Sequence, residues 1–185
     1  MASTEVGATL LRVARAAIST ALGRPMAVTQ DAAWLHEPGA CFVTLTQQGQ
    51  LRGCMGTLEA RRPLLTDVQA NAVAAALHDT RFAPLTAAEL NHTRVEVSLL
   101  SPPQPLHFDS EAHALAQLRP GVDGVVFQFG HHRSTFLPQV WEQLPTATEF
   151  MAHLKRKAGL SPGFWDPRIE LQRYTVQKWQ ECEET

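Results

Sequence analysis

The chain has 185 residues, of which 44% are hydrophobic and 18% are charged. These values are typical of a globular protein, and the length suits one domain with its own core, so we expect a single domain over residues 1–185. The net charge is −2 and the pI is about 6.4, which disfavours a regulatory nucleic-acid binder because no basic field attracts phosphates.

Three cysteines lie far apart in the sequence: Cys41, Cys54 and Cys182. An odd number of scattered cysteines predicts neither a disulfide framework nor a zinc site. The first residues lack a basic segment followed by an apolar one, so we expect no signal peptide. No apolar stretch approaches the roughly 20 residues that span a bilayer. We therefore expect a cytoplasmic protein without membrane contact.

The first half of the chain predicts two helices and a β-hairpin. Apolar residues at helical spacing indicate a helix over residues 5–22. Two β-prone segments, residues 41–46 and from Leu51 onward, flank a short glycine-containing turn and predict an antiparallel hairpin. A second helix is predicted from Pro63 to His78, and its alanine-rich middle indicates close packing on a sheet. Thr86-Ala-Ala-Glu89 is a capping box that opens one helical turn.

The second half predicts further strands and helices. The remaining elements are, in chain order, an alternating strand over Arg94–Leu100, a helix capped by Asp109, a hairpin of residues 124–129 and 133–136, a helix from the capping box at Thr146 to Gly159, and a final strand over residues 169–179. We interpret the basic run Lys155–Lys157 as a solvated helix end rather than a nucleic-acid patch. Hairpins interspersed with helices predict an α+β fold of antiparallel sheets with flanking helices.

The best candidate site is the strand Leu51-Arg-Gly-Cys-Met-Gly56. Alternation predicts that Arg52 and Cys54 share one face, where a guanidinium favours the reactive thiolate. Gly53 and Gly56 indicate a bulge, a bend, or close approach by a ligand or by backbone. In the alternative interpretation Cys54 is a small core residue, the glycines accommodate a sheet bend and Arg52 pairs with a carboxylate.

Other polar residues are weaker candidates. His78, Asp79 and Arg81 follow a helix end, where His78 either caps the helix carbonyls or the loop supplies an acid, a base and an anion ligand to a cleft. Glu96 lies on the polar face of its strand, and Gln139 lies in an apolar segment where it is free to bind a ligand. The pair His131-His132 is interpreted as a surface turn rather than a metal site. No nucleotide-binding loop, hydrolase elbow or metalloprotease motif is present, and the residues identify no cofactor.

The ordered set of motifs resembles the AMMECR-type domain family, whose bacterial members are called AmmeMemoRadiSam system protein A. The resemblance covers about residues 10–179 and rests on a series of segments taken in order: Phe42-Val-Thr-Leu45, Leu51–Gly56, Asn71-Ala72, His78–Pro84, Val95–Pro102, Gly121–Gly124 and Thr135–Val140. The family hexapeptide usually ends Cys-Ile-Gly, and Met55 replaces the isoleucine here.

This resemblance implies two closely packed lobes in one α+β domain, with the segment Leu51–Gly56 lining the site. It also implies two partners, a Memo-type protein that is similar to extradiol dioxygenases and a radical-SAM protein. Our leading hypothesis is a catalytic or ligand-binding site with Cys54 as thiolate or redox centre and Arg52 beside it. Asp79, Arg81 and Glu96 would orient groups and transfer protons. The main rival is a protein-interaction module that uses the same cleft.

Overall fold

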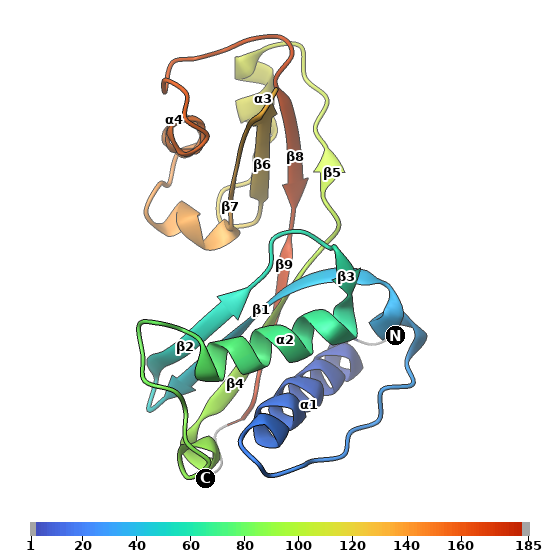
Figure 1. Ribbon diagram of the computed structural model, residues 1–185. Coiled ribbons are helices and arrows are strands. Elements are labelled where there is room, and N and C mark those ends of the chain that lie inside the picture. Colours follow the sequence, from blue (N-terminus) through green and yellow to red (C-terminus); the bar gives the residue numbers. More distant parts are fainter. Residues whose placement is uncertain (1–2, 183–185) are drawn as a thin grey trace. The chain divides into compact units, whose positions relative to one another are not determined.

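The computed structural model describes residues 3–182, and the chain divides into two compact units (Figure 1). Unit 1 comprises Met1–Leu100 with Gln177–Thr185, and unit 2 comprises Ser101–Val176. Each unit has an antiparallel sheet with helices, which confirms the predicted α+β class. The predicted single domain over residues 1–185 stays a prediction.

The sheet of unit 1 has the strand order β2-β1-β4-β9, with the short β3 pairing at the start of β1. These strands are β1 (Pro38–Gln47), β2 (Gln50–Gly56), β3 (Arg62–Pro63), β4 (Arg94–Leu100) and β9 (Val176–Gln180). The predicted hairpin is confirmed as β1–β2, and β4 has the predicted bounds. β2 and β9 are therefore the two edges of the path.

Two helices, α1 (Ser3–Ala21) and α2 (Leu64–Leu77), pack on one face of this sheet (Figure 1). The short helices η1 (Ala33–His36) and η2 (Glu89–His92) complete unit 1. Alternate residues of the strands, such as Val43, Val95 and Val97, are fully buried against the helices. The intervening residues, which include Thr44 and Glu96, lie on the opposite face and are half-buried.

Unit 2 has the strand order β5-β8-β6-β7. Its elements are β5 (Gln104–Pro105), α3 (Glu111–Gln117), β6 (Gly124–Phe129), β7 (His132–Phe136), η3 (Pro138–Glu142), α4 (Ala147–Lys157) and β8 (Glu170–Tyr174). The rings of Trp141 and Phe150 stack at 3.9 Å in its core. The predicted hairpin and the capping box at Thr146, which accepts from the Glu149 N–H, are confirmed.

Three predictions for the second half are wrong. The predicted final strand is two strands, because the chain passes from the sheet of unit 2 (β8) to the sheet of unit 1 (β9) at Thr175. Ser110 rather than Asp109 caps α3, since its side chain accepts from the His113 N–H. Lys155 is not solvated: its side chain is 1% exposed, and its ammonium donates to Glu111 Oε1 at 2.5 Å.

Unit 2 is an insertion between two neighbouring strands of unit 1. The chain leaves unit 1 after β4 and re-enters at β9, which pairs with β4. At the start of the insertion, the Ser101 N–H donates to the Thr175 carbonyl at 2.9 Å, and the Thr175 N–H donates to Ser101 Oγ at 2.9 Å. The two connecting segments are therefore bonded to each other.

Candidate functional site

The pairing of edge strand β2 with β1 shifts in the middle of the candidate segment. Gly53 pairs with Leu45, but Leu51 pairs with Thr46, so Arg52 is an extra residue in a β-bulge. A bulge interrupts the regular alternation of side chains and re-aims the extra one. A bulge or bend was one of the alternatives indicated by glycines in this strand, and its effect falls on Arg52.

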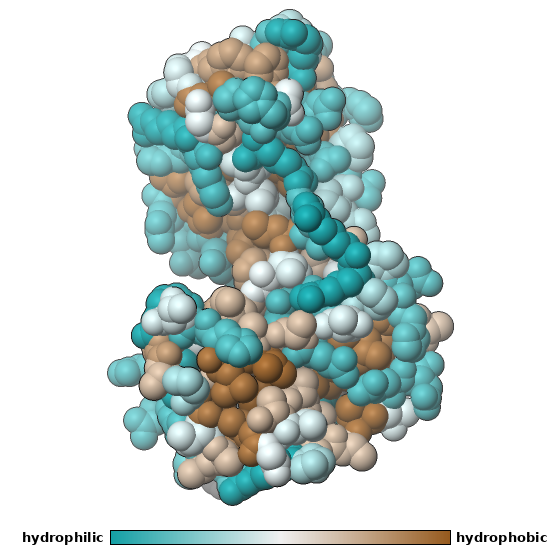
Figure 2. Space-filling model, in the orientation of Figure 1, coloured by the Kyte–Doolittle hydropathy of each residue, from teal (hydrophilic) through white to brown (hydrophobic). Residues whose placement is uncertain are grey.

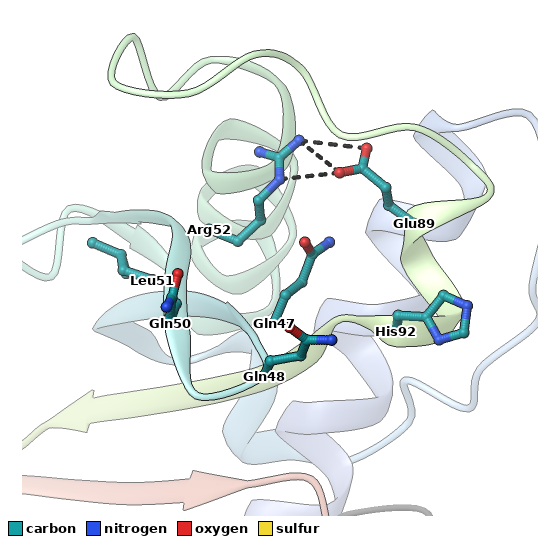
Figure 3. A pocket seen from close by; sticks show the side chains of 7 residues that line it. All are labelled: Gln47, Gln48, Gln50, Leu51, Arg52, Glu89 and His92. Atoms are coloured by element: carbon teal, nitrogen blue, oxygen red, sulfur yellow. Dashed lines mark hydrogen bonds and ion pairs between the residues drawn. The ribbon is translucent and has the colours of Figure 1, made fainter.

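The bulge changes which side chain accompanies Cys54. The partners of Leu51 and Cys54 on β1 are two residues apart, so Leu51 and Cys54 lie on the same face of the sheet. The expectation that Arg52 shares this face by simple alternation is wrong. In Figure 3, Arg52 is directed at Glu89 and Leu51 is directed away from that pair.

The side chain of Arg52 hydrogen-bonds β2 to the segment that follows α2. Its guanidinium donates from Nε and Nη2 to Glu89 Oε1, each at 3.2 Å, and from Nη1 to the Ala83 carbonyl at 2.9 Å. The pKa of Glu89 is lowered to about 2, chiefly because its carboxylate accepts from the Thr86 N–H and hydroxyl, with Arg52 adding to the effect. Pairing with a carboxylate is the structural alternative that the sequence left open for Arg52.

Cys54 instead contacts Asp79, which in turn binds Arg81. Its backbone N–H, which points out of the sheet edge, donates to Asp79 Oδ2 at 2.9 Å. Arg81 binds the same carboxylate through Nε at 2.9 Å and Nη2 at 2.7 Å, and this pairing holds the pKa of Asp79 well below its usual range. The pKa of Arg81 is raised, mainly by Asp79 and also by the negative charge of a Cys54 thiolate. Arg81 therefore places a positive charge on the carboxylate that binds the Cys54 backbone.

The register also places three polar groups in one row across the sheet. Thr44 of β1 pairs with Cys54 of β2 on one side and with Glu96 of β4 on the other. Directly paired residues project from the same face, and neighbouring strands are about 5 Å apart. Thr44 Oγ1 lies 3.4 Å from Cys54 Sγ. A thiol, a hydroxyl and a carboxylate thus share the face opposite the helices, a combination suited to nucleophilic attack and proton transfer.

Packing accounts for both glycines of the segment. A Cβ on Gly53 would lie 2.1 Å from the Ala75 carbonyl oxygen of α2, and a Cβ on Gly56 would lie 2.3 Å from the Phe42 ring. Gly53 therefore permits close approach of backbone, one of the predicted alternatives. The predicted close packing of the alanine-rich helix on the sheet is confirmed at this point.

A buried network around Asp67 was missed by the sequence analysis. The Asp67 carboxylate is 1% exposed and accepts from the Cys41 N–H, Thr57 hydroxyl, Arg62 Nε and Asn71 Nδ2 at 2.6–3.0 Å. Asp67 and Asn71 are four residues apart on one face of α2, and this spacing was the available signal. The network joins β1, α2 and the segment after β2 near one end of the hairpin.

The other two cysteines differ sharply in environment. Cys41 is fully buried, and its pKa is raised because burial disfavours the thiolate and Asp67 lies nearby. Cys182 is exposed. Its neighbour Glu181 binds Arg15, while Glu183 lies outside the described residues.

The remaining candidates belong to unit 2. Gln139 is an exposed residue of η3, His131 is exposed in the turn between β6 and β7, and His132 is half-buried at the start of β7. Within residues 3–182, no three His, Cys, Asp or Glu side chains are grouped so as to hold a metal ion. No helix in this described part of the chain is long and apolar enough to cross a membrane.

Comparison with known proteins identifies relatives over nearly the whole chain. A protein of Methanothermobacter thermautotrophicus is 37% identical, with 97% of this chain and 96% of the relative aligned. Protein MJ0810 of Methanocaldococcus jannaschii is 34% identical over 97% of this chain and 92% of its own. The crystal structure of uncharacterized protein PH0010 from Pyrococcus horikoshii superposes with a TM-score of 0.76 at 32% identity, covering 96% of this chain and 92% of that one. The AMMECR1 family model matches residues 11–179, and the chain belongs to the AMMECR1 family.

Proposed function

We propose that this protein carries a thiol-based catalytic or ligand-binding site at Cys54, on the sheet face that also presents Thr44 and Glu96. Cys54 acts as thiolate nucleophile or redox centre, Arg81 supplies the compensating positive charge, and Glu96 transfers protons. The three described cysteines are all free, which supports a reducing compartment such as the cytoplasm.

The observation that carries this proposal is the chain of contacts from Arg81 through Asp79 to Cys54. A carboxylate alone at the Cys54 N–H would oppose a thiolate, because like charges repel. Arg81 neutralises Asp79 with two hydrogen bonds and adds a positive charge that interacts with the thiolate. Cys54 is also half-buried rather than enclosed, so a ligand can reach it.

Alkylation by iodoacetamide tests the proposal, with the rate for each cysteine read by mass spectrometry between about pH 6 and pH 9. We expect Cys54 to be the fastest of the three thiols near neutral pH and Cys41 the slowest, because Cys41 is buried. Arg81→Met should slow Cys54 labelling by about threefold or more at pH 7 and leave Cys182 unchanged.

The chain supplies a matched control in unit 2. Arg168 binds Asp166 through the same two nitrogens, Nε and Nη2, in the same Asp-x-Arg spacing. Arg168→Met should therefore leave Cys54 labelling unchanged, and Arg52→Met should change it less than Arg81→Met does. Equal labelling of Cys54 and Cys41, or a Cys54 rate indifferent to Arg81, would refute the thiolate proposal.

A second candidate function is docking of a partner protein on the same region. Leu51 and Met55 of β2 and Leu58, shortly after it, are 42%, 37% and 39% exposed. Figure 2 shows apolar surface gathered over the region of α2 and β2 in unit 1. These side chains lie along one edge of the sheet, and exposed apolar surface favours protein interaction sites. A Memo-type protein and a radical-SAM protein are the partners we propose, on the basis of the family resemblance.

Titration calorimetry with a purified Memo-type protein, and separately with a radical-SAM protein, tests docking. We expect Leu51→Asp to weaken binding by about tenfold or more and Cys54→Ser to leave it unchanged. The control is Val122→Asp, because Val122 of unit 2 is 44% exposed, a fraction similar to the 42% of Leu51. Absence of binding to both proteins, or equal loss with Val122→Asp, counts against this candidate.

A further inference from the structure

A cavity of about 420 Å³ lies at the tip of the β1–β2 hairpin (Figure 3). One wall comes from the hairpin turn and the bulge, and the other comes from η2. The lining residues are Gln47, Gln48, Gln50, Leu51, Arg52, Glu89 and His92. Its volume falls in the range of about 300–1,000 Å³ that is usual for small-molecule sites. The cavity lies entirely within unit 1.

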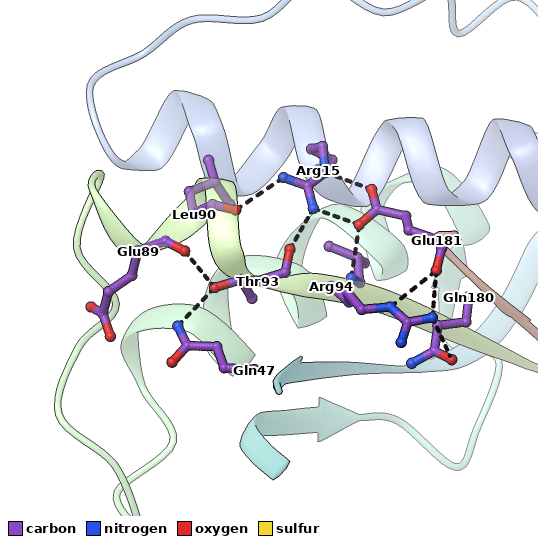
Figure 4. Close-up of polar contacts among 9 residues, drawn as sticks. Arg15, Gln47, Glu89, Leu90, Thr93, Arg94, Gln180 and Glu181 are labelled. Carbon is purple, nitrogen blue, oxygen red and sulfur yellow. Dashed lines mark hydrogen bonds and ion pairs between the residues drawn. The ribbon is translucent and has the colours of Figure 1, made fainter. Parts of the chain in front are cut away.

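The two walls are fixed to each other by the buried hydroxyl of Thr93. Thr93 is 2% exposed, accepts from Gln47 Nε2 at 2.9 Å and donates to the Glu89 carbonyl at 2.8 Å (Figure 4). Because only one of the two Nε2 hydrogens of Gln47 is bound to Thr93, the other hydrogen and the Oε1 acceptor remain for a ligand. The amide at the base of the cavity is therefore held in one orientation before anything binds.

A second layer holds Thr93 and η2 in place. Arg15 of α1 donates to the Thr93 carbonyl at 2.6 Å and to the Leu90 carbonyl at 3.3 Å (Figure 4). The same guanidinium binds both carboxylate oxygens of Glu181, each at 2.5 Å. A cavity supported by buried, hydrogen-bonded side chains binds with less ordering cost than a loop that must be arranged by its ligand.

The charges of the lining exclude a simple ion site. Arg52 and Glu89 are opposite in sign and already bind each other, so a bound anion or cation would compete with an existing pair. The other polar groups are three carboxamides and one imidazole. A carboxamide offers a donor and an acceptor side by side, which matches the same arrangement on another amide or on a nucleobase edge.

We propose that this cavity binds a small uncharged ligand that presents a hydrogen-bond donor and acceptor side by side, as a primary carboxamide or a nucleobase edge does. Gln47 pairs with that edge. The proposal is independent of thiol chemistry at Cys54, because none of the lining side chains acts on the sulfur.

Titration of the full chain, followed by ¹⁵N–¹H spectra that include the glutamine side-chain amides, tests the proposal. The probes are adenosine, uridine and an N-acetylated dipeptide amide, with inorganic phosphate as an anionic comparison. We expect at least one neutral probe to shift the Gln47 and His92 signals in a saturable way, with an apparent Kd below about 1 mM. The responding probe distinguishes a nucleobase from a primary carboxamide as the source of the edge.

Variants define the site further. Gln47→Leu and Thr93→Val should each weaken binding of the responding probe by about tenfold. Gln47→Leu removes the side-chain amide, and Thr93→Val removes the hydroxyl that holds this amide in place. His92→Ala changes an exposed side chain and should weaken binding without affecting folding. The control is Gln128→Leu in unit 2, which should bind like the original chain. No saturable shift up to about 10 mM, shifts indifferent to Gln47→Leu and His92→Ala, or preferential response to phosphate would each overturn the proposal.

Discussion

Gly53 of β2 lies against the Ala75 carbonyl of α2 so closely that a Cβ at this position would be 2.1 Å from the oxygen. We predict that Gly53→Ala lowers the free energy of unfolding by about 1–3 kcal/mol, because helix or strand backbone must move to admit the methyl group. Urea denaturation measures this. Gly163→Ala is the control, since open space surrounds Gly163 and a change below about 0.5 kcal/mol is expected. Equal effects of the two substitutions would contradict the close approach.

Asp67 should be among the most sensitive polar positions in unit 1. Asp67→Asn removes a buried charge that accepts from four different groups, so we expect the free energy of unfolding to fall by about 2–4 kcal/mol. Asp109→Asn, at a side chain that is 84% exposed, should cost less than about 1 kcal/mol. If both variants unfold at the same urea concentration, the network contributes no special stability.

Ionisation of Glu89 makes the stability of the fold depend on pH. Its pKa is about 2 in the folded chain against 4.5 for an ordinary glutamate, so its contribution is fully present above about pH 4.5 and is lost as the pH falls toward 2. We expect Glu89→Gln to lower the urea midpoint near pH 6. On acidification to pH 2, the midpoint of this variant should fall less than that of the wild-type protein. Thr86→Val should act in the same direction, because the Thr86 hydroxyl donates to the carboxylate. A wild-type and a Glu89→Gln midpoint that fall in parallel from pH 6 to pH 2 would argue against this contribution.

The whole chain should unfold in one transition. Both connections of unit 2 continue directly into β4 and β9, and the strands that they join are neighbours in one sheet. Scanning calorimetry should therefore give a single peak whose van't Hoff and calorimetric enthalpies agree. Two separated transitions, or a proteolytic fragment of unit 2 that refolds alone, would show that the units are independent domains.

Local patterns predicted most of the fold correctly. The strand β4 and the capping box at Thr146 were correct because alternation and capping are determined by residues a few positions apart. The bonds between Thr86 and Glu89 also form, but η2 begins at Glu89 rather than after Thr86. The segment 169–179 remained β-prone throughout, but its division depends on which sheet each half joins. Contacts between residues distant in sequence determine which sheet each half joins.

The same distinction applies to the site. Cys54, Asp79, Arg81 and Glu96 were selected from sequence, but the pairing of Arg52 with Cys54 rested on strand alternation alone. The bulge at Arg52 arises from the pairing with β1, so the contact of Cys54 with Asp79 and Arg81 in place of Arg52 was not readable locally. Lys155 shows the same limit, because its burial depends on Glu111 of another helix.

The insertion of unit 2 has a consequence for biosynthesis. When the ribosome has made the first 100 residues, β4 has no neighbour on the side that β9 later occupies, and Trp179 is not yet present to cover Gly7 of α1. At roughly 5–20 residues per second, residues 101–176 take about 4–15 s to add. Throughout that interval the nascent chain presents an unpaired strand edge, the kind of surface on which chains associate with one another. Residues that are translated only after unit 2, β9 and Trp179, are thus the ones that protect the first half of the protein.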